Sequence, residues 1–199
     1  MAIADYLVDR MIEKNIISED KEIYIYGLNN GFTILINFMT ALFLSYIVRK
    51  TDILLFLLIS FIPLRSYCGG IHCKSRFLCY IYSNIIITCL LVIQNFFCKN
   101  ITIFLIISFA NFIYLFCTKT DGNRVRSLDD YEIVRYTKIK RIILLIITFG
   151  GSILFLKNFF QYSTTIFSSI NLSAILVVLE KIKNKKLFNT SYEIICKKV

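Results

Sequence analysis

The sequence predicts an all-α polytopic membrane protein, and two observations carry this prediction. Of its 199 residues, 57% are hydrophobic and only one is proline, a composition that belongs in a bilayer rather than in water. The apolar residues also gather into six runs, and the charged residues lie in the short segments between them. The runs are 28–48, 53–64, 77–97, 101–117, 142–156 and 163–179.

The six runs predict about six transmembrane helices, of which the second is short or re-entrant. A spanning helix needs about 20 mostly apolar residues, and the run at 53–64 has only 12. No internal repeat and no Pro-rich or Ser-rich linker divides the chain. We therefore expect residues 1–199 to form one integral-membrane domain, with a transmembrane bundle over 27–180 and a basic cytoplasmic tail over 181–199.

Residues 1–26 precede the bundle, and they predict an amphipathic helix on the cytoplasmic face of the membrane. Apolar residues recur there near helical spacing, with charged residues between them. A soluble helix packed on the loops would show the same pattern, and this alternative stays open. The apolar set is Ala2, Ile3, Tyr6, Leu7, Met11, Ile12 and Ile16.

The basic residues predict the orientation of the chain. Of the 23 Lys and Arg residues, 19 lie before the first run, at 65–76, at 118–141 and after residue 180. Positively charged short segments stay in the cytoplasm, so both termini and the segment 65–79 are expected on the inner face of the plasma membrane. The net charge of +10 is then explained by orientation, and it requires no nucleic acid.

The segment 65–79, RSYCGGIHCKSRFLC, holds the only histidine of the chain and three of its seven cysteines. His72 and Cys79 are seven residues apart, or about 10 Å along a continuous helix, which is too far for a thiol–imidazole hydrogen bond. Gly69 and Gly70 can adopt the positive φ angles of a tight turn. We therefore expect the backbone to break in this segment, helped by Pro63, which cannot donate a helical hydrogen bond.

Cys79 is a candidate nucleophile, with His72 as its base. If the third span begins near Phe77, Cys79 lies in its first turn, where free backbone N–H groups and the helix dipole favour a thiolate. The same N–H groups could hold an oxyanion. His72 would take the thiol proton and later return a proton to a leaving amine.

Two other interpretations of these residues stay open. Cysteines in apolar surroundings are commonly small hydrophobic residues without chemistry. A zinc site is the second alternative, because the segment supplies four ligands of the kind zinc accepts, although it lacks paired CxxC spacing. These four residues are Cys68, His72, Cys73 and Cys79.

The pattern of residues in this segment resembles the signature of the AgrB family (accessory gene regulator B), membrane cysteine endopeptidases of Gram-positive quorum sensing. Length, N-terminal amphipathic segment, number of helices and the basic loop after the fourth run are similar too, so the resemblance covers nearly the whole chain. One departure is Cys73, which stands where the family usually has alanine and adds a second thiol beside the presumed base. The residues that carry the resemblance are Arg65, Gly69, Gly70, His72, Cys79 and Ser83.

The resemblance implies an AgrD-like propeptide as substrate, with an amphipathic leader, a core that contains a cysteine, and an acidic tail. Cys79 would attack the carbonyl at the junction of core and tail and hold the core as a thioester, which the cysteine of the core would convert to a thiolactone. Arg65, Gly69, Gly70 and Ser83 would bind substrate or support the site. The resemblance also suggests a homodimer. No metal or cofactor is expected, and no GxxxxGK[ST] motif for a nucleotide occurs.

Rival functions and further site residues remain open on the sequence alone. A small multi-span peptide exporter is the main alternative, but its spans would be expected to hold ionisable residues, and the six runs contain no Asp, Glu, Lys or Arg. The basic segment 118–141 is either a dock for the acidic tail or only an orientation signal. Asp121 or Asp129 would orient His72 only if this segment folds over it. In-span Asn37, Asn84 and Asn111 could bond between helices of one chain or between two chains.

Overall fold

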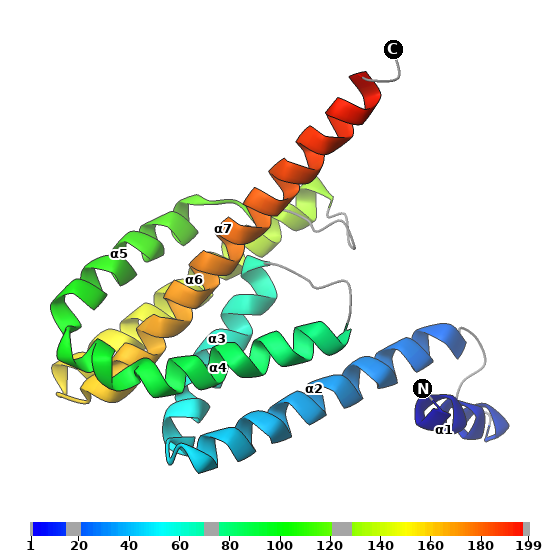
Figure 1. The fold of residues 1–199 in the computed structure, drawn as a ribbon, viewed down its shortest axis with the longest axis horizontal. Helices are drawn as coiled ribbons and strands as arrows, with labels where there is room; N and C mark the ends of the chain where they lie inside the picture. Colours follow the sequence, from blue (N-terminus) through cyan, green and yellow to red (C-terminus); the bar gives the residue numbers. More distant parts are fainter. Residues whose placement is uncertain (1, 15–20, 70–75, 121–128, 197–199) are drawn as a thin grey trace.

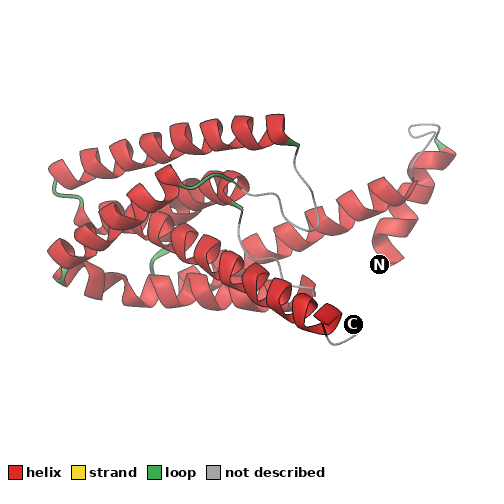
Figure 2. Ribbon diagram, turned by 90° about the horizontal axis from the view of Figure 1, so that it is seen from above, coloured by secondary structure: helices red, strands yellow, loops and turns green. Residues whose placement is uncertain are grey.

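The computed structural model describes residues 2–14, 21–69, 76–120 and 129–196, and every regular element over these residues is a helix (Figures 1 and 2). The helices follow one another along the chain, joined by short connections. In order they are α1 (Ala2–Glu13), α2 (Lys21–Ile47), α3 (Thr51–Cys68), α4 (Arg76–Lys99), α5 (Ile101–Cys117), α6 (Asp130–Leu156) and α7 (Phe160–Cys196).

Five of these helices are long and apolar enough to cross a membrane, namely α2, α3, α4, α6 and α7 up to Lys183. This confirms the prediction of an all-α polytopic membrane protein. The sequence predicted that the second run would be the short one, but the short apolar helix is α5. It has 17 residues, or about 26 Å at 1.5 Å per residue. That run lies inside α3, which has 18 residues because it takes in polar residues at both ends.

Pro63 does not end α3, which continues to Cys68. A proline inside a transmembrane helix removes one backbone hydrogen bond, and neighbouring helices tolerate this loss. The helix ends instead at Gly69, whose φ of 76° is in the range that favours glycine. The structural break therefore falls at the glycines and not at the proline.

The helices run alternately up and down, as the alternating charge of the loops predicts. The α2–α3, α4–α5 and α6–α7 connections lie together at one end of the bundle (Figure 1). At the other end α3, α5 and α7 end and α4 and α6 begin. Arg65, in the last turn of α3, and Cys79, in the first turn of α4, are therefore at the same end of the bundle as the C-terminal end of α7 (Figure 1).

The N-terminal residues divide between two helices. Residues 21–26 belong to the first long helix, α2, while α1 covers Ala2–Glu13 and packs against α2. Asp9 of α1 forms an ion pair with Lys21 of α2. Val8 is fully buried, whereas Tyr6 is 59% exposed. The position of α1 on the membrane surface stays a prediction.

The central helix of the bundle is α7, which contacts α3, α4, α5 and α6. Its buried face is rich in small hydroxyl residues, which let neighbouring backbones approach closely. Most of these hydroxyls donate to carbonyls of α7 itself, and Ser163 Oγ donates to Gly151 O of α6 at 2.9 Å. The set is Ser163, Thr164, Thr165, Ser168, Ser169 and Ser173.

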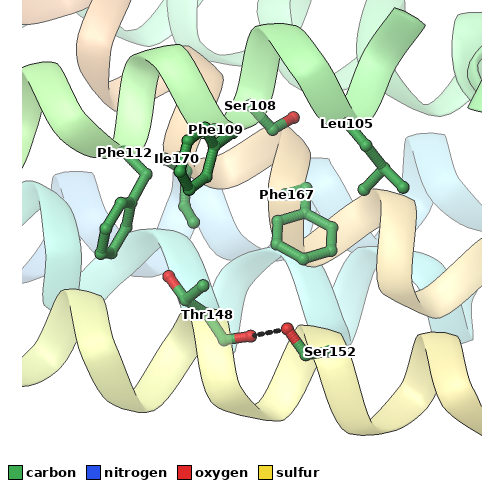
Figure 3. A pocket seen from close by; sticks show the side chains of 8 residues that line it. All are labelled: Leu105, Ser108, Phe109, Phe112, Thr148, Ser152, Phe167 and Ile170. Atoms are coloured by element: carbon green, nitrogen blue, oxygen red, sulfur yellow. Dashed lines mark hydrogen bonds between the residues drawn. The ribbon is translucent and has the colours of Figure 1, made fainter. Parts of the chain in front are cut away.

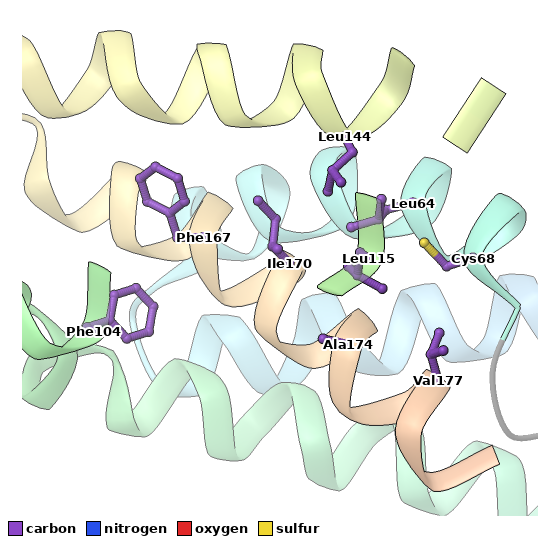
Figure 4. Close-up of a cluster of buried hydrophobic side chains, with 9 residues drawn as sticks. All are labelled: Leu64, Cys68, Phe104, Leu115, Leu144, Phe167, Ile170, Ala174 and Val177. Atoms are coloured by element: carbon purple, nitrogen blue, oxygen red, sulfur yellow. The ribbon is translucent and has the colours of Figure 1, made fainter. Parts of the chain in front are cut away.

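The main hydrophobic core lies where α3, α5, α6 and α7 meet (Figure 4). Leu64, Leu115, Leu144 and Ile170 are its fully buried members. Cys68, the last residue of α3, also belongs to this cluster and is only 5% exposed. The end of α3 that leads to the predicted site is thus fixed by the core.

The contact between α6 and α7 gives a prediction about stability. A Cβ on Gly151 would come within 3.2 Å of Ile166 and Phe167, whereas one on the adjacent Gly150 would meet nothing within 4 Å. We expect Gly151→Leu to destabilise the protein by about 1–3 kcal/mol through overpacking. Gly150→Leu is the matched control and should leave stability unchanged. Thermal unfolding in detergent measures both, and equal melting temperatures would contradict the close packing of α6 on α7.

Candidate functional site

Cys79 lies in the first turn of α4, as its fourth residue, and it is exposed. It lines a cavity of about 400 Å³ between α3, α4 and α7. Backbone N–H groups in the first turn of a helix generally have no acceptor within the helix, and Cys79 lies in the turn that carries these groups. The cavity is lined by Phe61, Arg65, Cys79, Tyr82, Ser83, Ile86, Ile87, Leu172, Leu176 and Leu179.

Three of the residues predicted for the site, Arg65, Cys79 and Ser83, therefore share one cavity. They come from two helices, since Arg65 is in the last turn of α3 and the other two are in α4. The third wall is provided by α7, and no pattern in the sequence pointed to it. Leu172, Leu176 and Leu179 have the spacing of one helix face. The sequence indicates that this face is apolar, but not that it lines a site.

Gly69 and Arg65 shape the point at which the chain leaves α3. The Nη1 group of Arg65 donates to the Gly69 carbonyl at 3.0 Å. Gly69 has φ 76° and ψ −153°, a combination essentially restricted to glycine. A Cβ on Gly69 would stand 3.6 Å from Oε2 of Glu180 in α7. Glu180 is thus an acidic neighbour of this turn that the sequence did not reveal, because only the packing of α7 against α3 brings the two together.

Ser83 belongs to a polar contact between α2 and α4. Its hydroxyl donates to Asn37 Oδ1 at 3.0 Å and also lies 3.0 Å from the Tyr80 carbonyl. Asn84 Nδ2 donates to the same Asn37 oxygen at 2.9 Å. Asn111 bonds to Asn171 of α7, likewise within the chain. The in-span asparagines thus connect helices of one protomer.

These bonds predict a structural role for Ser83. Because its single proton is used toward Asn37 or Tyr80, we expect Ser83→Ala to retain the propeptide cleavage that the resemblance implies. Loss of one hydrogen bond should lower stability by about 0.5–1.5 kcal/mol. Cleavage rate and thermal unfolding, measured on the same preparation, separate the two effects. A loss of cleavage at unchanged stability would show instead that the hydroxyl acts on the substrate.

His72, Gly70 and Cys73 lie outside the described residues, so the pairing of His72 with Cys79 stays a prediction. The described residues do distinguish two of the thiols. Cys68 is buried in the apolar core, and Cys79 is exposed at the cavity. Among the described residues no three His, Cys, Asp or Glu side chains come together as a metal site, and two of the four ligands of the zinc alternative are outside that range.

The basic segment 118–141 is partly helical, because α6 begins at Asp130. Lys140 is 1% exposed, and its ammonium donates to the Thr118 carbonyl. Thr120 donates from its hydroxyl to the Tyr67 carbonyl of α3 at 3.0 Å. These bonds connect the start of the segment to α3 and α6, so Lys140 supports the end of the bundle and is not an accessible dock for an acidic tail.

A second cavity, of about 270 Å³, lies between α5, α6 and α7 (Figure 3). Its polar groups are the hydroxyls of Ser108, Thr148 and Ser152. All three are used within their own helices, since Ser108 donates to Phe104 O, Thr148 to Leu144 O and Ser152 to Thr148 O. This cavity has no thiol and no charged residue in its walls, so the cavity beside Cys79 is the better candidate for chemistry.

The fold and the cavity beside Cys79 define a helical membrane protein that presents an exposed thiol between three of its helices, α3, α4 and α7. Residues 2–179 match the family model Accessory gene regulator B (AgrB), and the chain belongs to the AgrB family. This confirms the resemblance seen in the sequence and supports a role in the processing of the agr autoinducer peptide in a membrane, from an AgrD propeptide. No curated protein and no solved structure matches the chain.

Proposed function

We propose that the protein is a membrane cysteine endopeptidase that removes the C-terminal tail of an AgrD-like propeptide and promotes cyclisation of the core to a thiolactone. One observation carries this proposal: Cys79 is exposed in the first turn of α4, at a cavity that it shares with Arg65. A nucleophile needs access to its substrate and donors for the developing oxyanion. The cavity supplies access, and the start of α4 supplies backbone N–H groups.

In the first step the Cys79 sulfur bonds to the carbonyl carbon at the junction of core and tail. His72 takes the thiol proton and delivers it to the leaving nitrogen, so that the C–N bond breaks and the tail departs as a free amine. In the second step the thiol of the core cysteine attacks the thioester. The ring closes, and Cys79 is released as a thiol.

The energetics of the two steps explain why no cofactor is needed. Exchange of one thioester for another is nearly balanced in energy. Formation of a thioester from an amide is uphill, and removal of the tail or of the ring product must drive it forward. Arg65 is placed to bind a carboxylate of the substrate through its planar, forked donors.

The proposed orientation has both termini and the 65–79 segment at the cytoplasmic face of the plasma membrane. Most basic residues are in segments at that end, and a propeptide made by cytosolic ribosomes reaches the same face. We also propose a homodimer, on the resemblance alone, because Asn37, Asn84 and Asn111 bond within one chain. Native mass spectrometry of the protein in nanodiscs measures its oligomeric state, and a monomer would overturn this proposal.

The test of the function uses the purified full-length protein in liposomes, with a synthetic AgrD-like propeptide added in the absence of any ion gradient. The proposal predicts release of the free tail, detected by mass spectrometry. Uptake of intact peptide without tail release would favour the exporter. A metal chelator should leave the rate unchanged, and loss of cleavage that added Zn²⁺ restores would favour the metal alternative.

A further inference from the structure

The cavity beside Cys79 has an apolar interior and a polar mouth. Six of its ten lining residues are Phe, Ile or Leu, and Arg65 is the only one that carries a charge. Arg65 and Cys79 are at the helix ends next to the 70–75 connection. Ile86 lies seven residues beyond Cys79 along α4, or about 10 Å deeper into the bundle. The apolar part therefore extends away from the thiol toward the middle of the bundle.

The wall formed by α7 follows the same direction. Leu179, Leu176 and Leu172 line the cavity in turn, and α7 runs antiparallel to α4 (Figure 1). Glu180 stands next to Gly69 at the end of α3, so Leu179 is at the level of the mouth, and Leu172, seven residues earlier in α7, is about 10 Å deeper. A volume of about 400 Å³ is within the range of sites that enclose small apolar ligands.

The chemistry of a thioester decides which part of the substrate enters this space. In the acyl-enzyme the sulfur is bonded to the carbonyl carbon, and the next atom is the Cα of the residue before the cleaved bond. The side chain of that residue therefore begins three bonds from the Cys79 sulfur. The tail is attached through the nitrogen that leaves the carbonyl carbon, so it is not part of the acyl-enzyme.

We propose that the cavity lined by Phe61, Ile86 and Leu176 binds the side chain of the propeptide residue directly before the cleaved bond, and selects a large apolar residue there. This inference rests on the proposed function and adds its specificity. A lysine side chain at that position would lose its hydration without gaining a partner in the apolar interior, and Arg65 at the mouth would repel it. A small side chain such as Ala would leave the space unfilled.

The first test is a series of synthetic AgrD-like propeptides that differ only in the residue before the junction, which is Phe, Leu, Ala or Lys. With wild-type protein in liposomes, we expect Phe and Leu to be cleaved about 10-fold or more faster than Ala. They should be cleaved at least about 10²-fold faster than Lys, because burial of an unpaired ammonium group is costly and Arg65 repels it. The readout is kcat/KM for tail release.

The second test changes the cavity. Leu176→Trp fills the interior and should reverse the order, so that the Ala peptide is cleaved faster than the Phe peptide. Ile175→Trp is the matched control, since Ile175 is 53% exposed and does not line the cavity, and it should keep the wild-type order. The peptide series uses wild-type protein, so it decides the question even where Leu176→Trp does not fold.

The outcomes separate this inference from the function on which it rests. Equal cleavage of all four peptides by the wild type would overturn the proposed specificity site. The proposed endopeptidase function would stand, and lipid chains would be the next candidate occupant of the cavity. Failure to cleave any peptide would overturn the proposed function itself. If Leu176→Trp and Ile175→Trp change the order of the four cleavage rates equally, the cavity does not set the specificity.

Discussion

Substitution Cys79→Ser is expected to lower tail release by about 10³-fold or more, as removal of a nucleophile does in hydrolases that use a covalent intermediate. The oxygen of serine is a much weaker nucleophile than a thiolate near neutral pH. His72→Ala should cost about 10²–10⁴-fold, the usual contribution of a general base. Mass spectrometry of the tail, at substrate concentrations well below KM, measures both losses.

Cys73→Ser is the matched control for these variants, because it removes the neighbouring thiol and should retain cleavage. Thermal unfolding of all three proteins in detergent establishes that they fold. Trapping the core as an adduct on Cys79, located by peptide mapping, would add direct support. If Cys79→Ser cleaves as fast as the wild type, the assignment of the nucleophile fails, and Cys73 or a metal site becomes the next hypothesis.

Substitution Gly69→Ala is expected to reduce tail release about 10-fold or more. The backbone at Gly69, with φ 76° and ψ −153°, costs a residue with a Cβ of the order of 1–3 kcal/mol. Among the described residues the added methyl group would approach only Glu180 Oε2, at 3.6 Å, so the expected cost comes from the backbone conformation. The turn would relax to another conformation, and the carbonyl that accepts from Arg65 would move with it.

Gly27→Ala is the control for Gly69→Ala, because Gly27 lies in helix α2 and a Cβ there meets none of the described residues within 4 Å. We expect Gly27→Ala to keep wild-type activity and stability. A further variant, Gly69→Asn, should be less impaired than Gly69→Ala, since asparagine adopts positive φ more readily. Full activity of Gly69→Ala at unchanged melting temperature would show that the turn at Gly69 does not position the site.

The hydropathy of the sequence predicted the positions of the helices well, but it predicted their lengths less accurately. The run 101–117 coincides with α5, because Asn100 and Thr118 flank it with polar residues where the helix also ends. In contrast, α6 begins at Asp130, 12 residues before the apolar run at 142. Hydropathy detects contact with lipid, whereas a helix continues wherever its backbone bonds and caps allow, including through charged residues outside the bilayer.

The sequence predicted the residues that α3 and α4 contribute to the candidate site, but not those of α7. Arg65, Cys79 and Ser83 were found because they follow a spacing along the chain, and all three line one cavity. Leu176 and Glu180 were not found, because their closeness to the site comes from the packing of α7 against α3 and α4. In the sequence a leucine that lines a cavity is indistinguishable from one that faces lipid. The pairing of His72 with Cys79 stays a prediction.

The central position of α7 also bears on biogenesis. A ribosome completes α7 after the six other helices, yet α7 contacts α3, α4, α5 and α6 and forms one wall of the cavity beside Cys79. Its buried hydroxyls are mostly satisfied by its own carbonyls, so α7 can insert into lipid as an independent segment before it docks. The cavity is therefore assembled only once α7 has been synthesised and has docked, and a nascent chain that lacks α7 would hold its nucleophile without a place to bind substrate.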